Sequence, residues 1–279
     1  MFFLETSGRS WLTPREACAL ESAATSSNLR VNIIFLSEFV DLYDNSTCAI
    51  FKLIPSVNFF TIKLRDAFVD TPLHRIYQRE GWRHSLFRAV HTSDALRIAL
   101  IYKVGGFYSD LDSLSLGDLS SLENVIGATN MRGEESHLAN GAFHLRKHHP
   151  LLWRVMEEIL TSYSGRERNE IGPLLVTRSV RQHFNISDVI SINTGERGGL
   201  RVLPSRAFYP AKSEVNYLSG PGMLLKKMKS VCSNIFVAGN PETMVSGACV
   251  TGDVADTVKW ISHDSLLWIS NKSADSSGR

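Results

Sequence analysis

The amino-acid sequence predicts an α/β fold, in which strands and helices alternate along a chain of 279 residues. Two continuous apolar runs, VNIIFL at 31–36 and VNFFTIKL at 57–64, are typical of strands that helices cover on both faces. A long helix is predicted at 84–104, where the glycines at 105–106 end it. This alternation favours a sheet flanked by helices.

Local patterns predict the remaining elements in order. Residues 2–4 form a short strand, and Pro14 stands in the first turn of a helix over 14–27, where proline is tolerated. FYSDLDSLSL at 107–116 is expected to be a strand and the segment that follows it. Later elements are a strand at 123–127, a strand at NGAFHLRK (140–147), and helices at 150–163 and 173–184. Without an internal repeat or a clear linker, we expect a single domain.

Composition and charge argue against two classes of protein. Lysine and arginine total 30 against 28 acidic residues, and no long basic run is present, so nucleic acid is not an expected partner. The apolar runs are far shorter than the roughly 20 residues that span a bilayer. The opening MFFLETSGRS has no basic segment followed by an apolar one, and we expect it to correspond to the middle of a protein.

The cysteines and glycosylation sequons bear on the cellular compartment. The four cysteines are Cys18, Cys48, Cys232 and Cys249, and their spacing is not that of a zinc site. Four cysteines can form two disulfides in three different ways. N-glycosylation sequons begin at Asn45, Asn185 and Asn271, as expected for a secretory protein. A cytosolic protein with free thiols stays an alternative, because such tripeptides also arise by chance.

Two carboxylates, Asp110 and Asp112, stand one residue apart directly after the double glycine. On a strand, both side chains would lie on one face, with Leu111 on the other. Two like charges so close together are unfavourable unless a positive charge lies between them. A divalent cation with oxygen ligands is the usual solution, so this pair predicts a metal site.

A second charged pair, Asp94 and Arg97, lies on the predicted helix 84–104. The plain interpretation is an ion pair between residues i and i+3, which contributes roughly 0.2–0.5 kcal/mol. The helix leads directly to the double glycine and the paired carboxylates. Asp94 and Arg97 are therefore also candidates for lining the same cavity.

At 93–116, SDALRIALIYKVGGFYSDLDSLSL resembles the S-D-x-x-R-x-x-x-L-x-x-x-G-G-x-Y-x-D-x-D stretch of DxD-containing sugar transferases. Further blocks narrow the resemblance to the alpha-1,4-glycosyltransferase family. In chain order they are FFLETSGR, CALESAA, RDAFVDTPL, NGAFHLRKHHP, GPLLVTR and LPSRAFYP. The resemblance extends from Phe2 to Trp268 and is specific because the blocks keep the family's order.

This resemblance implies a GT-A fold, a Rossmann-like mixed sheet that holds a UDP-sugar at the carboxyl ends of its strands. Residues 1–127 would form the nucleotide-sugar-binding half with the DxD motif. Residues 128–270 would form the acceptor side, and 271–279 are expected to be a disordered tail.

The same resemblance implies roles for individual residues. Asp110 and Asp112 would bind Mn²⁺ with the diphosphate, while Asp94 and Arg97 would contact donor-sugar hydroxyls. Asn140 would lie near the anomeric carbon, although Asn-Gly is also a common turn pair. The candidate catalytic residues are Asp94, Arg97, Asp112 and Asn140. The candidate substrate-binding residues are Phe3, Leu4, Glu5 and Thr6 for the uridine, then Asp94, Arg97, Tyr108, Asp110, Asn140, Gly141, Gly172, Pro173 and Trp268.

The carboxyl-terminal region departs from the family pattern. The family ends in a block like H-x-W-N-K, whose histidine completes the metal site and whose tryptophan covers the diphosphate. Trp268 matches this tryptophan, but Leu266 stands where the histidine would be. The metal site is therefore expected to lack one ligand, unless His263 replaces it.

The resemblance implies a glycosyltransferase that moves a hexose or N-acetylhexosamine from a UDP-sugar with retention of the anomeric configuration. A galactose-type sugar is the first expectation. The acceptor would be a lactosylceramide-like glycolipid, joined in alpha-1,4 linkage during glycosphingolipid biosynthesis. The resemblance implies that the protein is a Golgi type II membrane protein, whose anchor we expect to lie outside this sequence. The alternative is a catalytically degenerate member that acts as a binding or chaperone-like module. Haloacid dehalogenase phosphatases also carry a strand followed by DxD, but Gly105 and Gly106 before the motif argue against that class.

Overall fold

The computed structural model describes residues 1–129, 137–189, 192, 199–209 and 259–261. The chain forms two compact units, each made of separate stretches. Among the described residues, unit 1 contains Met1–Ile62, Ser109–Ser121 and 259–260, and unit 2 contains Lys63–Tyr108, most of Leu122–Lys212 and Ile261. Each unit combines strands with helices, so the predicted α/β class with a helix-flanked sheet is confirmed.

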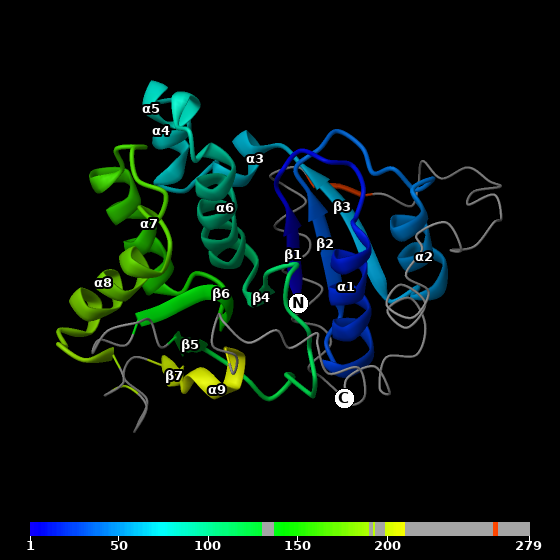
Figure 1. The fold of residues 1–279 in the computed structure, drawn as a ribbon. Helices are drawn as coiled ribbons and strands as arrows, with labels where there is room; N and C mark the ends of the chain where they lie inside the picture. Colours follow the sequence, from blue (N-terminus) through cyan, green and yellow to red (C-terminus); the bar gives the residue numbers. More distant parts are fainter. Residues whose placement is uncertain (130–136, 190–191, 193–198, 210–258, 262–279) are drawn as a thin grey trace. The chain divides into compact units, whose positions relative to one another are not determined.

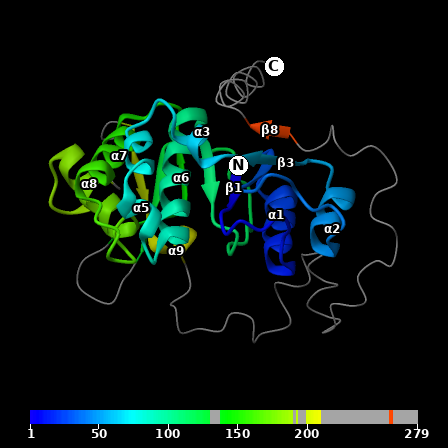
Figure 2. The same ribbon diagram turned by 90° about the horizontal axis from the view of Figure 1, so that it is seen from above.

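Unit 1 is built on the parallel strands β1 (Phe2–Glu5), β2 (Val31–Phe35) and β3 (Val57–Ile62), in that order. The helices α1 (Pro14–Ser26) and α2 (Asn45–Leu53) connect them. Both helices lie on the same side of these strands (Figures 1 and 2). The side chains of the strands are mostly buried, which explains their continuous apolar sequences.

Helix α1 begins where the sequence indicates. The Thr13 side chain accepts a hydrogen bond from the Glu16 amide, and the Glu16 carboxylate accepts one from the Thr13 amide at 2.7 Å. This capping box satisfies two amides that the first turn would otherwise leave unpaired, and Pro14 follows at the first helical position.

Unit 2 contains a mixed sheet with the order β7 (Arg201–Leu203), β5 (Val125–Thr129), β6 (His137–Leu145) and β4 (Gly106–Ser109). Strand β5 runs parallel to β7 and antiparallel to β6. The predicted strands at 123–127 and 140–147 correspond to β5 and to most of β6.

Three long helices frame unit 2: α6 (Arg88–Val104), α7 (Pro150–Ser162) and α8 (Pro173–Phe184). Helix α7 packs against α6 and α8, and α8 packs against β6. The shorter helices are α3 (Leu64–Phe68), α4 (Leu73–Tyr77), α5 (Glu80–His84) and α9 (Ser205–Phe208). The last described element is the short strand β8 (Lys259–Ile261).

Two expected elements differ from the structure near their ends. The helix expected at 84–104 is interrupted, because Ser85 ends α5 and its hydroxyl accepts from the Phe87 amide at 3.1 Å. This local bond competes with helical pairing, and α6 begins at Arg88. The Asn-Gly pair at 140–141 is not a turn but lies inside β6.

A bulge in β6 accounts for the position of that pair. Ile126 pairs with Phe143, whereas the next residue, Gly127, pairs with Ala139. The three residues 140–142 therefore have no directly opposite partners on β5. Bulges of this kind redirect side chains out of the regular strand alternation.

The disulfide, the helix lengths and the tail bear on the remaining expectations. Cys18 is disulfide-bonded, whereas Cys232 and Cys249 lie outside the described residues. Of the helices in the described part of the chain, none combines the length and apolar character that a membrane span requires. The expected tail at 271–279 also lies outside the described residues.

Candidate active site

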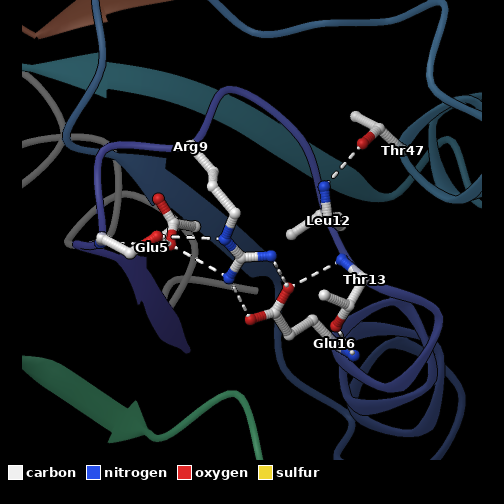
Figure 3. A network of polar contacts seen from close by, with 7 residues as sticks. Glu5, Arg9, Leu12, Thr13, Glu16 and Thr47 are labelled. Carbon is white, nitrogen blue, oxygen red and sulfur yellow. Dashed lines mark hydrogen bonds and ion pairs between the residues drawn. The ribbon is translucent and has the colours of Figure 1, made fainter.

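A polar network surrounds the carboxyl end of β1 in unit 1 (Figure 3). Glu5 Oε1 accepts hydrogen bonds from the Ser7 amide at 3.1 Å and from Arg9 Nη2 at 3.1 Å. Arg9 also donates from Nη1 and Nη2 to the Glu16 carboxylate, at 3.1 and 2.6 Å. The guanidinium thus connects the strand end to the first turn of α1.

Glu5 retains hydrogen-bonding capacity at this strand end. Its side chain is buried, and within the described part of the chain Oε2 has no hydrogen-bond partner. A buried carboxylate oxygen without a partner is unfavourable unless a ligand donates to it. Phe3 and Leu4, the other candidates on β1, are buried in the hydrophobic core, and the partly exposed Thr6 follows the strand.

The paired carboxylates lie in a turn and not on a strand. Strand β4 ends at Ser109, and the Ser113 hydroxyl donates to the Asp110 carbonyl at 2.7 Å. The Ser109 and Ser113 hydroxyls also lie 2.6 Å apart. These serine bonds close a turn over Asp110 and Asp112, so the expected strand alternation of the two aspartates is wrong.

The turn fits a cation that shares its ligands with a substrate. Asp112 is exposed and Asp110 is partly exposed. Two accessible carboxylates provide hard oxygen ligands and leave most coordination positions to phosphate oxygens and water. Among the described residues, no cluster of three or more His, Cys, Asp or Glu side chains could hold a metal ion by itself.

In unit 2, α6 and β6 bring together Asp94, Arg97 and Asn140. The Asn140 side-chain amide donates to Asp94 Oδ1 at 2.9 Å, and Arg97 Nη2 lies 3.4 Å from the same oxygen. Arg97 Nη1 also donates to the Asn140 carbonyl at 3.0 Å. The i,i+3 ion pair therefore exists, but it is one part of a buried cluster that includes the bulged strand.

The Arg97 guanidinium has further partners. Nη2 donates to the Ser93 hydroxyl at 2.8 Å, and Nε donates to the Ser93 carbonyl at 3.2 Å. The guanidinium carbon also lies 4.8 Å from the centre of the Tyr108 ring. Because Arg97 and Asp94 are both buried, their opposite charges and these hydrogen bonds offset the desolvation of each.

The start of α8 lies beside this cluster. Gly172 is the N-cap of α8 and Pro173 occupies its first turn. A methyl group at the Gly172 α-carbon would lie 3.6 Å from Asp94 Oδ2. Gly172 therefore faces Asp94 Oδ2 across a space that a methyl group would fill, and Gly141 follows Asn140 in the bulge of β6.

The structure adds residues that the sequence analysis missed. Ser93 fixes Arg97, and Arg9 with Glu16 holds Glu5. The T-x-x-E pattern at 13–16 indicates a capping box and therefore places Glu16 at the start of a helix. The bonds of Ser93 to Arg97, four residues later, had no indication beyond helical spacing. Trp268, Leu266 and His263 lie outside the described residues.

Two protein-family models match the chain. Residues 13–132 match the glycosyltransferase sugar-binding region containing the DXD motif. Residues 144–218 match the alpha 1,4-glycosyltransferase conserved region. The first match contains the Asp110–Asp112 turn and α6, and the second contains α7 and α8.

Curated relatives extend these matches. Lactosylceramide 4-alpha-galactosyltransferase of Pan troglodytes is 30% identical over 75% of this chain and 59% of its own length. Human alpha-1,4-N-acetylglucosaminyltransferase is 29% identical over 75% of this chain and 62% of its own length. The lactosylceramide 4-alpha-galactosyltransferase of Pongo pygmaeus is 32% identical over 56% of this chain, a region that covers 69% of the relative. The chain thus spans about three fifths of the length of the first two relatives.

A solved structure resembles the fold. The PaToxG glycosyltransferase aligns with a TM-score of 0.50 and 16% identity, over 66% of this chain and 69% of its own. At this identity the likeness concerns the fold, and it agrees with a GT-A type of α/β architecture.

Proposed function

Because this chain belongs to the alpha-1,4-glycosyltransferase family, we propose that it transfers a sugar from a UDP-sugar to a glycolipid in alpha-1,4 linkage, with retention of configuration. The observation that carries the proposal is the accessible turn of Asp110 and Asp112, directly after a buried strand within the region that matches the DXD family model. Residues 1–127 would form the donor half, and residues 128–270 would form the acceptor side.

Asp110 and Asp112 would hold a divalent cation, which we propose to be Mn²⁺. When bound, such an ion neutralises the donor diphosphate and stabilises the UDP leaving group. The exposure of Asp112 supports this role because a ligand shared with a substrate must be reachable from solvent. Trp268 is proposed to cover the diphosphate, as the family resemblance implies.

Asp94, Arg97 and Asn140 would bind the donor sugar. Asp94 Oδ1 is already occupied by Asn140 and Arg97, so the carboxylate is held in one orientation before a ligand arrives. A fixed carboxylate can accept a hydrogen bond from a sugar hydroxyl without a further loss of side-chain freedom. The entropic cost of binding is therefore lower. The Tyr108 ring, whose centre lies 4.8 Å from the Arg97 guanidinium carbon, would help to hold this guanidinium in place.

Glu5 and Thr6 would bind the uridine at the end of β1. The buried Glu5 Oε2 has hydrogen-bonding capacity for an N–H or O–H donor, and uracil N3–H and the ribose hydroxyls are donors of this kind. Phe3 and Leu4 would support this site through the core.

The donor is proposed to be a galactose-type sugar and the acceptor a lactosylceramide-like glycolipid. The curated relatives carry names of both a galactosyl and an N-acetylglucosaminyl transferase, so the test includes both donors. Gly172 and Pro173 would lie on the acceptor side. We propose a Golgi luminal setting with a membrane anchor outside this sequence, and the disulfide of Cys18 fits an oxidising compartment.

The experiment compares Asp112→Asn with the unaltered chain. Donor hydrolysis and transfer to a lactosyl acceptor are measured with UDP-galactose, UDP-N-acetylgalactosamine and UDP-N-acetylglucosamine, each with and without Mn²⁺. We expect Mn²⁺-dependent turnover in the unaltered chain and its loss in Asp112→Asn with the fold intact. The matched control is Asp118→Asn, since Asp118 is an exposed aspartate of the same segment whose hydrogen-bond partners Ser120 and Asn28 are not candidate site residues.

Two results would contradict the proposal. Normal turnover of Asp112→Asn with Mn²⁺ would show that this turn does not bind the catalytic metal ion. Absence of turnover with every donor, in an unaltered chain that is folded, would instead favour a non-catalytic member of the family.

A further inference from the structure

A buried histidine on α6, His91, joins this helix to the segment between α7 and α8. Its Nδ1 lies 3.0 Å from the Tyr163 hydroxyl. Its Nε2 lies 3.0 Å from the Glu167 carbonyl and 3.2 Å from the Arg168 carbonyl. Since carbonyls only accept, Nε2 carries the proton and Nδ1 accepts from Tyr163.

The segment that His91 holds, residues 163–172, is also closed by two other contacts. The Glu170 carboxylate accepts from the Ser164 amide and, at 2.8 Å, from the Gly165 amide. The Ser85 hydroxyl donates to the Gly165 carbonyl at 2.8 Å. We name residues 163–172 the α7–α8 loop. Its backbone is thus fixed from inside by Glu170 and from outside by Ser85 and His91.

The same loop ends at the candidate donor-sugar cluster. Its last residue, Gly172, faces Asp94 Oδ2, because a methyl group added at its α-carbon would lie 3.6 Å from this oxygen. His91 precedes Asp94 by three residues on α6, so both side chains lie on one face of the helix. One helical face therefore holds the loop at His91 and meets the end of that loop at Asp94.

We infer that His91 is a positioning residue for donor-sugar binding: it fixes the α7–α8 loop so that Gly172 keeps bounding the space beside Asp94 Oδ2. This inference rests on the proposed function, in which Asp94 binds the sugar. Asp94 Oδ1 is oriented by Asn140 and Arg97, and the Gly172 backbone bounds the side of Oδ2. If the loop moves away, the space beside Oδ2 enlarges and a sugar hydroxyl is held less well.

The side chain at position 91 must reach the two carbonyls of the loop. Glutamine places its amide nitrogen near the position of histidine Nε2, whereas the asparagine amide is one methylene shorter. His91→Gln therefore keeps the donation to Glu167 and Arg168, and His91→Asn loses it. The two variants share their functional group and differ by one methylene, so their comparison sets the Nε2 contacts with Glu167 and Arg168 against the Nδ1 contact with Tyr163.

The experiment measures the affinity of each variant for UDP and for the tighter of UDP-galactose and UDP-N-acetylglucosamine, by calorimetry with Mn²⁺. UDP lacks the sugar and serves as the internal reference. We expect His91→Asn to weaken UDP-sugar binding by about tenfold, which one or two lost hydrogen bonds would produce, and to leave UDP binding unchanged. His91→Gln should retain most of the affinity for the UDP-sugar.

Two other variants complete the set. Ser85→Ala removes a single hydrogen bond to the same loop, the one to the Gly165 carbonyl, and should weaken UDP-sugar binding by a smaller factor than His91→Asn does. This variant tests the inference even if His91→Asn does not fold. His149→Asn is the matched control, because His149 is equally buried in unit 2 but caps α7, away from the loop. It should leave the ratio of UDP to UDP-sugar affinity unchanged.

The outcomes separate this inference from the proposed function. An unaltered chain that binds neither UDP nor a UDP-sugar overturns both. Equal weakening of UDP and UDP-sugar in His91→Asn, or no weakening in His91→Asn and Ser85→Ala, overturns the inference and leaves the proposed function standing. Equal loss in His91→Gln and His91→Asn also overturns it.

Discussion

The Asn140 side-chain amide donates a 2.9 Å hydrogen bond to Asp94 Oδ1 and thereby joins β6 to α6 inside unit 2. The two residues are 46 positions apart in the chain, and both are buried. The bond depends on the bulge of β6, which takes Asn140 out of the regular pairing with β5.

Replacing Asn140 by alanine should reduce donor-sugar binding more than it reduces UDP binding. Asp94 would lose an amide donor, and a lost bond to a charged group corresponds to about 1.5–3 kcal/mol. Calorimetry with UDP and UDP-sugar measures the difference. The control is Asn58→Ala, which removes a side-chain bond to Asn32 in unit 1 and should lower only the unfolding temperature. Equal effects of both variants on the UDP-sugar would contradict the prediction.

Replacing Arg97 by lysine should abolish most of the transfer activity although the charge is kept. Lysine cannot reproduce the simultaneous bonds to Ser93 and the Asn140 carbonyl, nor the flat contact with Tyr108. Initial rates of donor hydrolysis measure the loss. Arg178→Lys is the control, because Arg178 pairs with Glu158 on the surface and such pairs contribute little. Full activity in Arg97→Lys would contradict the prediction and would show that Arg97 acts only as the ion-pair partner of Asp94.

Replacing Gly105 by alanine should destabilise the fold strongly. The residue has φ +70°, and an added methyl group would lie 2.6 Å from the Lys147 backbone nitrogen. Gly8→Ala isolates the backbone strain, about 1–2 kcal/mol, since Gly8 has φ +89° and open space. Gly117→Ala has neither problem and should change the free energy of unfolding least. Urea denaturation should therefore rank Gly105→Ala as the least stable variant, and a loss no larger than that of Gly8→Ala would contradict the steric argument.

Acidification should destabilise the chain through His149. Burial, together with Arg146 and His183, lowers the pKa of His149 to about 4, and Nδ1 accepts from the Leu151 amide. The unfolded chain takes up this proton near its ordinary pKa of about 6.5, while the folded chain resists it. The contribution of His149 to stability is therefore present above pH 6.5 and is lost as the pH falls from about 6.5 to 4.

The variant His149→Asn tests this effect, because asparagine also caps helices but does not titrate. Unfolding temperatures measured between pH 7 and 4 should fall less steeply for His149→Asn than for the unaltered chain. Parallel curves would show that His149 does not contribute to acid sensitivity.

Much of the fold could be predicted from short stretches of sequence. The runs at 31–36 and 57–64 became β2 and β3 because apolar continuity is a local property of buried parallel strands. The start of α1 followed from Thr13, Pro14 and Glu16, which satisfy each other's backbone within four residues. Where a nearby side chain competes for the backbone, prediction failed, as at Ser85 and Ser113.

The sequence by itself determined the α/β class, the position of the double glycine and the residues available for chemistry, including Asp94, Arg97 and Asp112. Each of these depends on residue type and on spacing along a short segment. Only the tertiary structure decided that Asn140 meets Asp94 and that His91 holds a loop more than 70 residues away. Such contacts arise when helices and strands pack, and local periodicity says which face of an element is apolar but not which distant polar groups it will meet.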